Sequence, residues 1–143
     1  MSNEKDLTLK EAFDLAVQNH QEGRLDVAQE FYNQVLKINP NYADAHNNLG
    51  VIFKDLGDLE KAIDCFEKAI AINPHYLDAH NNLGVIFKEI GKNQKAMDCY
   101  EKSIVINAND VNVHYNLGVI FQELNDYQKA KSCFEKAIAI NPN

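Results

Sequence analysis

Three kinds of chemically capable side chain recur at an interval of 34 residues along the chain. They are imidazoles, primary amides and thiols, which stand at His46, His80 and His114; at Asn48, Asn82 and Asn116; and at Cys65, Cys99 and Cys133. Imidazole and thiolate bind metals, thiols also do redox chemistry, and a primary amide offers both a donor and an acceptor to a peptide group. The spacing decides which of these chemistries is open to each column.

An interval of this length argues against a shared metal ion and against disulfides. If each unit is a helical hairpin, equivalent residues lie about 10 Å apart, the distance between packed helices. Zinc–nitrogen bonds are only about 2.0–2.1 Å long, and a disulfide requires Cα atoms within about 7 Å. We therefore expect no metal site, a structural role for the histidines between hairpin helices, and reduced cysteines that pack in the interior.

The residues offer little for catalysis. The only serines are Ser2, Ser103 and Ser132, and none has an evident base beside it to activate a nucleophile. No glycine-rich phosphate loop is present, and acidic residues alternate with lysines as on a solvated helix face. We predict no catalytic residues, no cofactor and no enzymatic activity.

The elements that position these columns are themselves repeated. The stretch Asn47–Lys54 recurs letter for letter at 81–88 and more weakly at 115–122. After a polar lead over residues 1–8, the interval defines a single domain over 9–143 with repeats at 9–42, 43–76, 77–110 and 111–143.

Each repeat reads as two helices. In the second repeat, apolar residues at spacings of three and four run to Gly57, and a second stripe begins at Leu59 and ends at Asn73-Pro74. Gly50, in the middle of the first helix, is expected to allow close packing against Ala62. The pattern predicts an all-α fold, an α-solenoid of four tandem helix-turn-helix hairpins in a right-handed superhelix with a concave inner wall.

Composition limits the partners. The chain of 143 residues carries a formal charge of −7, which disfavours nucleic acid and anionic membranes as partners. No window of eighteen apolar residues and no basic-then-apolar leader is present. We expect a soluble, cytoplasmic protein.

The repeat also resembles a known family. Its ordered positions are similar to the pattern of the tetratricopeptide repeat (TPR), and in the second repeat they are Leu49, Gly50, Phe53, Ala62, Phe66, Ala69 and Pro74. The asparagine column resembles the asparagine ladder in the TPR superhelix of O-linked N-acetylglucosamine transferases. This resemblance implies a helical solenoid that binds peptides along its inner wall.

On that basis the candidate peptide-binding residues lie on the first helix of each repeat. They are the ladder residues Asn48, Asn82 and Asn116, with Asn47, Asn81, Tyr115, Val51, Val85, Val119, Lys54 and Lys88 around them. The alternative is that the amides are solvated or cap local backbone groups. Acidic and basic residues are mixed along this wall, so the charge of the ligand stays open.

Three functions are compatible with these residues. The first is an interaction module that binds an extended peptide or a partner helix in a concave groove. The second is the N-terminal substrate-recruiting arm of a transferase whose catalytic domain lies beyond residue 143, and the third is a scaffold that stacks end to end. Because the last hairpin is followed by no capping helix, we expect either a piece of a longer protein or a homo-oligomer formed through that hairpin.

Overall fold

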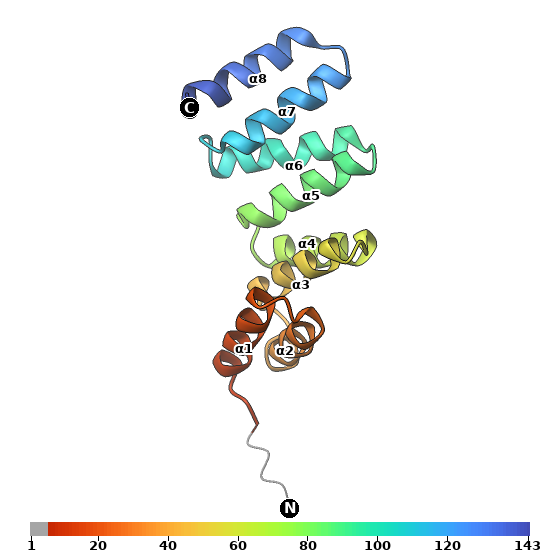
Figure 1. Ribbon diagram of the computed structural model, residues 1–143, viewed down its shortest axis with the longest axis vertical. Coiled ribbons are helices and arrows are strands. Elements are labelled where there is room, and N and C mark those ends of the chain that lie inside the picture. The colour runs from red at the N-terminus through yellow and green to blue at the C-terminus, as the bar shows by residue number, and fades with distance from the viewer. Residues whose placement is uncertain (1–5) are drawn as a thin grey trace, which may run out of the picture. The chain divides into compact units, whose positions relative to one another are not determined.

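The computed structural model describes residues 6–143, so residues 1–5 of the predicted polar lead lie outside the described part (Figure 1). Residues 6–143 form eight α-helices and no strand. The helices are α1 (Leu9–Gln21), α2 (Leu25–Ile38), α3 (Ala43–Asp55), α4 (Leu59–Ile72), α5 (Leu77–Glu89), α6 (Asn93–Ile106), α7 (Val111–Glu123) and α8 (Tyr127–Ile140). The predicted all-α class is confirmed, and each odd-numbered helix begins on the first residue of a predicted repeat.

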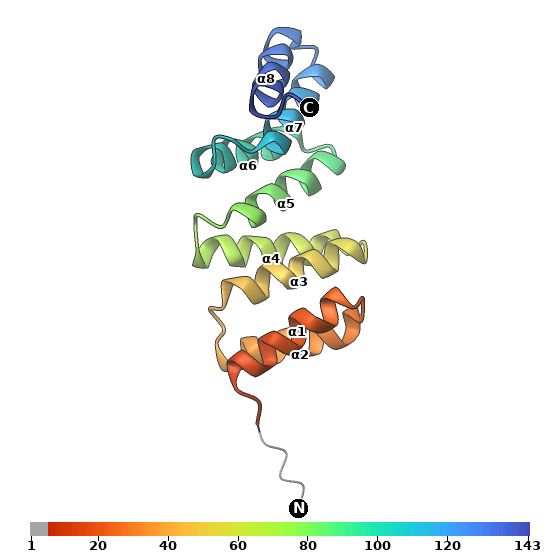
Figure 2. The same cartoon turned by 60° about the vertical axis from the view of Figure 1, so that its left-hand side comes forward.

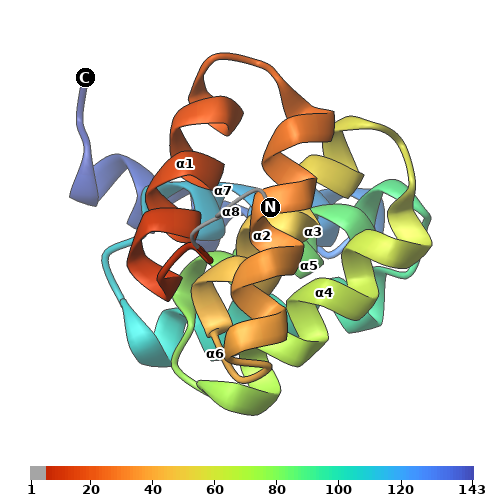
Figure 3. The same ribbon diagram turned by 90° about the horizontal axis from the view of Figure 1, so that it is seen from below.

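The helices form two compact units. The first ends at Pro74 and contains α1 to α4, and the second begins at His75 and contains α5 to α8. In each unit two antiparallel hairpins follow one another, α1–α2 with α3–α4 and α5–α6 with α7–α8. Figure 2 shows the hairpins of the second unit, and Figure 3 shows α2 between α1 and α3 in the first.

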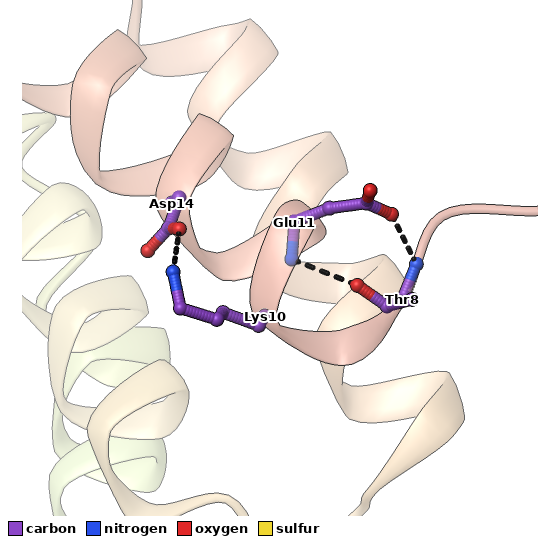
Figure 4. A network of polar contacts seen from close by, with 4 residues as sticks. All are labelled: Thr8, Lys10, Glu11 and Asp14. Atoms are coloured by element: carbon purple, nitrogen blue, oxygen red, sulfur yellow. Dashed lines mark hydrogen bonds and ion pairs between the residues drawn. The ribbon is translucent and has the colours of Figure 1, made fainter.

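Local signals explain where the helices begin. Thr8 and Glu11 form a capping box at the start of α1, with the Thr8 Oγ1 accepting from the Glu11 amide at 3.2 Å and the Glu11 carboxylate accepting from the Thr8 amide at 2.9 Å (Figure 4). Lys10 and Asp14 pair at 2.6 Å one turn further on. Aspartates Asp58 and Asp126 cap α4 and α8 by accepting a backbone amide three residues later.

The helices end at the glycine and asparagine residues that the sequence places after each apolar stripe. Gly57 stands after α3 with φ +79°, and Asn125 holds the equivalent position after α7 with φ +61°. These left-handed conformations suit glycine and asparagine. The second helices end at extended asparagines, and Asn107 is no exception (φ −140°, ψ 98°), although Ala108 replaces the proline found elsewhere. The helix α6 therefore ends at this asparagine although no proline follows it.

Glycines inside the first helices allow close packing, but the neighbour differs from the one predicted. A Cβ on Gly50 would lie 2.7 Å from the ring of Phe66, and one on Gly84 would lie 2.4 Å from the ring of Tyr100. The nearest neighbour is therefore not Ala62 but the aromatic side chain one turn after it, which covers the glycine. The repeated glycine therefore makes room for an aromatic ring in the middle of the last three hairpins, whereas the first has Ala16 at this position.

Candidate functional site

Two histidines of the column form hydrogen bonds to the loops between hairpins. His46 Nε2 lies 2.9 Å from the carbonyl oxygen of Pro40, and His114 Nε2 lies 2.8 Å from that of Ala108. Because a carbonyl only accepts, the imidazole donates from Nε2 in both cases. Both contacts join the first turn of an odd-numbered helix to the loop before it, which is the kind of structural role predicted. Within residues 6–143 no three His, Cys, Asp or Glu side chains gather as metal ligands would.

Two of the three free cysteines are buried as predicted, Cys65 and Cys133, whereas Cys99 is partly exposed. Cys65 and Cys133 are 8% and 9% exposed. Burial raises the pKa of the Cys65 thiol from 9.0 to about 11, and the nearby Asp64 carboxylate raises it further while Lys68 opposes the shift. A thiol protonated at neutral pH is a poor nucleophile and a poor metal ligand. These positions therefore serve the hairpin interior.

In the asparagine ladder, Asn48 and Asn116 each lie beside the hydroxyl of a tyrosine on the preceding helix. Asn48 Nδ2 donates to the Tyr32 hydroxyl at 3.1 Å, so α3 is linked to α2. In the second unit Asn116 lies beside the hydroxyl of Tyr100, which is buried without a hydrogen bond of good geometry. Burial raises the pKa of Tyr100 to about 12, and the Asn116 amide acts against that rise.

The amides that precede the ladder residues lie about 100° round the same helices, in line with the lysines seven residues later. Asn81 Nδ2 donates at 3.0 Å to Oδ2 of Asp110, the residue that caps α7. Near the other end of the same helix, Lys88 Nζ lies 3.5 Å from a carboxylate oxygen of Glu123. These two contacts tie α5 to α7. Asn47 is only 5% exposed, and its Oδ1 is buried without a hydrogen bond.

The remaining predicted residues share one face with the ladder in each unit. We call this surface the first-helix face, and it comprises Asn48, Val51 and Lys54 in the first unit and Asn82, Val85, Lys88, Tyr115, Asn116 and Val119 in the second. Most of these side chains are half-buried, whereas Tyr115 is 56% exposed and packs its ring 5.7 Å from that of Phe134. The face therefore combines amides, aliphatic groups, an aromatic ring and ammonium groups.

Sequence reasoning missed the tyrosine partners of the ladder. Tyr32 and Tyr100 each stand sixteen residues before a ladder asparagine. That shared spacing was the available signal, because it places a phenol on each second helix at the level of the next amide. A hollow of about 370 Å³ lies beside α8, on the hairpin whose uncovered side was expected to pair with another copy. Its lining is Gln122, Tyr127, Ala130, Lys131, Phe134, Glu135 and Ile138.

Comparison with protein families agrees with this geometry. A family described as "TPR repeat" matches residues 18–57 and 86–125, which is more than half of the chain. The chain belongs to the tetratricopeptide repeat family. Two further profiles, both described as "Tetratricopeptide repeat", match residues 43–76 and 111–143 and residues 65–98.

Solved structures show the same fold. A crystal structure of MamA is similar over 94% of this TPR chain and 79% of its own, with a TM-score of 0.89 and 24% identity. MamA 41-end from Desulfovibrio magneticus RS-1 is similar with a TM-score of 0.85 and 19% identity, over 97% of this chain and 78% of its own. BtubC (BKLC) from P. vanneervenii is similar with a TM-score of 0.82 and 26% identity, over 94% of this chain and 63% of its own. These likenesses establish an α-solenoid of helical hairpins.

A curated relative matches only a short stretch. The uncharacterized protein ycf37 of Pyropia yezoensis is 49% identical over 39 residues, 27% of this chain. The match spans about a fifth of that relative, 22% of its length. Membership of the TPR family supports a protein–protein interaction module. No helix within residues 6–143 has both the length and the apolar character needed to cross a bilayer.

Proposed function

We propose that this TPR chain binds an extended peptide of a partner protein on the first-helix faces of its units. The observation that carries the proposal is the second unit, where Asn82 and Asn116 stand on adjacent first helices that the Asn81–Asp110 and Lys88–Glu123 contacts hold together. A primary amide matches a peptide unit because it presents one donor group and one acceptor. Two such amides bind main chain without demanding a particular sequence.

The tyrosine contacts support this role. Asn48 donates one N–H of its amide to Tyr32, and its Oδ1 accepts from the Asn47 amide at 3.4 Å. The second N–H and one lone pair of Oδ1 are left to bind a ligand. A side chain already held in place loses less rotamer freedom on binding. We assign Tyr32 and Tyr100 the task of orienting the rungs toward the ligand.

The neighbours of the rungs give selectivity. Val51, Val85 and Val119 offer aliphatic contact one turn after each asparagine, and Tyr115 offers an exposed ring. Lys54 and Lys88 are the cations of the face, and Lys88 exchanges its contact with Glu123 for a ligand carboxylate. Asn47 is buried and Asn81 is bonded to Asp110, so in this proposal they stabilise the helices and are not the main ligand contacts.

The two other functions predicted from the sequence rest on less. The substrate-recruiting arm of a transferase uses the same peptide-binding face, and its only support is the resemblance of the asparagine ladder. Homo-oligomer formation has the exposed side chains of α8 in its favour, where Tyr127 is 64% and Ile138 61% exposed. We propose an interaction module without catalysis of its own, cytoplasmic, with a protein partner in preference to nucleic acid or membrane.

The test is a screen of extended peptides against the whole chain, followed by fluorescence anisotropy of the best binder. Asn82→Ala and Asn116→Ala should each weaken binding by about 0.5–1.5 kcal/mol, roughly 2- to 12-fold in Kd. Gln94→Ala is the matched control, because it removes an exposed amide that bonds Asp98 within α6. Unchanged affinity in the folded double variant would refute the proposal.

A further inference from the structure

The second helix of the last hairpin exposes an apolar hollow. Its seven lining residues come from the end of α7 and from α8, and they enclose about 370 Å³. Tyr127 and Ile138 at its two ends are 64% and 61% exposed, and Phe134 between them is half-buried. We call this surface, Gln122 together with Tyr127 to Ile138, the α8 face.

Two equivalents of the α8 face are covered by the next helix of their own unit. Phe134 is equivalent to Tyr32 on α2 and to Tyr100 on α6, which are 0% and 1% exposed. The helix that follows covers each tyrosine, since α3 packs on α2 and α7 packs on α6. The internal repeat therefore shows what kind of element fits this surface.

The covering helices share an apolar ridge with residues at i, i+4 and i+7. In α3 these are Ala45, Leu49 and Ile52, which join one core cluster with Tyr32. The same positions of α7, Val113, Leu117 and Ile120, are 1%, 5% and 0% exposed. Each covering helix also carries the ladder asparagine that meets the tyrosine hydroxyl. Phe134 has no hydroxyl, so a helix on the α8 face needs the apolar ridge alone.

A second copy stacked head to tail would present the wrong helix. The ridge positions of α1 are Glu11, Leu15 and Gln18, two of them polar, and the ladder position is Asp14. Glu11 is also engaged in the capping box with Thr8 (Figure 4). Burying this carboxylate against Phe134 and Ile138 would cost desolvation energy without a partner. The α1 surface is therefore a poor occupant.

From these relationships we infer that the α8 face is a docking site for an amphipathic helix of a partner protein, one with apolar residues at i, i+4 and i+7 as in α3 and α7. The helix lies across Phe134 and Ile138 as α3 lies across Tyr32. Lys131 and Glu135, paired at 3.7 Å on the rim, supply one charge of each sign to the polar edges of the docked helix. The α8 face adjoins the first-helix face, because the ring of Tyr115 lies 5.7 Å from that of Phe134. Its helix would lie on Phe134 and Ile138, which are not part of the first-helix face, so this inference stands independently of the peptide proposal.

The chain itself supplies the probe and its control. The probe is a labelled peptide of residues 77–89, whose ridge is Ala79, Leu83 and Ile86, and the control is a peptide of residues 9–21, whose ridge includes Glu11 and Gln18. Short isolated helices are marginal in water, so both peptides carry a lactam between two polar positions to hold the helix. Binding to residues 1–143 is followed by fluorescence anisotropy.

Two variants locate the binding. Ile138→Glu should weaken the probe by at least about tenfold, because a carboxylate would be buried under the docked helix. Val105→Glu should leave it unchanged, since Val105 is an apolar side chain 84% exposed on α6, outside the α8 face. The control peptide should not bind.

Three results would overturn the inference. They are absence of probe binding, equal binding of both peptides, and probe binding that ignores Ile138→Glu. Sedimentation of the chain alone adds a fourth, because a dimer abolished by Ile138→Glu would assign the α8 face to a second copy. Loss of extended-peptide binding in the asparagine variants, with helix binding intact, would separate the two surfaces.

Discussion

The amide of Asn48 on α3 donates to the hydroxyl of Tyr32 on α2, across 3.1 Å. The same hydroxyl lies 3.4 Å from Nδ1 of His20 on α1, so three helices meet at one buried phenol. A buried hydroxyl without a partner is costly, and this contact removes that cost. The ladder residue is thus an internal cross-link as well as a candidate ligand contact.

Removing the Tyr32 hydroxyl should weaken the first unit. We expect Tyr32→Phe to lower the free energy of unfolding by about 0.5–1.5 kcal/mol, as typical for a net hydrogen bond. Urea denaturation followed by circular dichroism measures the loss. Tyr42→Phe is the matched control, because no hydrogen bond of its hydroxyl occurs in the described residues and the expected change is near zero.

A double-mutant cycle tests whether the loss belongs to Asn48. If the two side chains act together, Tyr32→Phe combined with Asn48→Ala should cost less than the sum of the single variants. Strict additivity would contradict the cross-link.

Replacing the glycines beneath the aromatic rings by alanine should destabilise the protein to an extent that depends on how freely each ring can move. A Cβ at Gly84 would lie 2.4 Å from Tyr100, which is buried, so Gly84→Ala should cost about 1–3 kcal/mol through overpacking. At Gly118 the neighbour is Phe134, which is half-buried and freer to move. Gly118→Ala should therefore cost less, because its ring can move aside while both variants recover the same helix propensity of about 1 kcal/mol. Thermal unfolding of both variants compares them, and a larger loss at Gly118 would contradict the argument.

Much of the fold was readable from the sequence because its signals are local. The positive φ of Gly57 and Asn125 and the extended asparagines after each second helix depend on residues next to them. The start of each first helix followed from the interval of the repeat. The ring of Phe66 as the nearest neighbour of Gly50 was not predicted, because which side chain fills a gap between two helices depends on rotamers that a pattern does not specify.

The candidate site was less predictable. The first-helix position of the asparagines followed from helical spacing, but their partners did not. Asn81 meets Asp110 from 29 residues away, and the direction of an amide at the surface depends on such distant groups. The apolar ridge of α3 and the polar ridge of α1 differ only by residue type, so the consequence for the α8 face needed the packing of α3 on α2.

The turn after α3 should discriminate between side chains of similar size. Gly57 has φ +79°, a conformation that costs an ordinary L-residue roughly 1–2 kcal/mol. Gly57→Ala should show that loss in urea denaturation. Gly57→Asn should show much less, because Asn125 already adopts φ +61° at the equivalent place. Equal losses for the two variants would mean that the backbone conformation is not what limits this turn.

The buried thiol gives a dependence on alkaline pH. The folded pKa of Cys65 is raised from 9.0 to about 11, so between these values the unfolded chain releases a proton that the folded chain keeps. The stabilising contribution of the protonated thiol is fully present below pH 9 and is lost as the pH rises toward 11. Urea denaturation at pH 8, 9, 10 and 11 should therefore show falling stability. In Cys65→Ala the fall should be shallower over this window, with the remainder arising from groups such as Tyr100, whose pKa is raised to about 12. An identical slope in wild type and Cys65→Ala would show that the thiol does not titrate differently on folding.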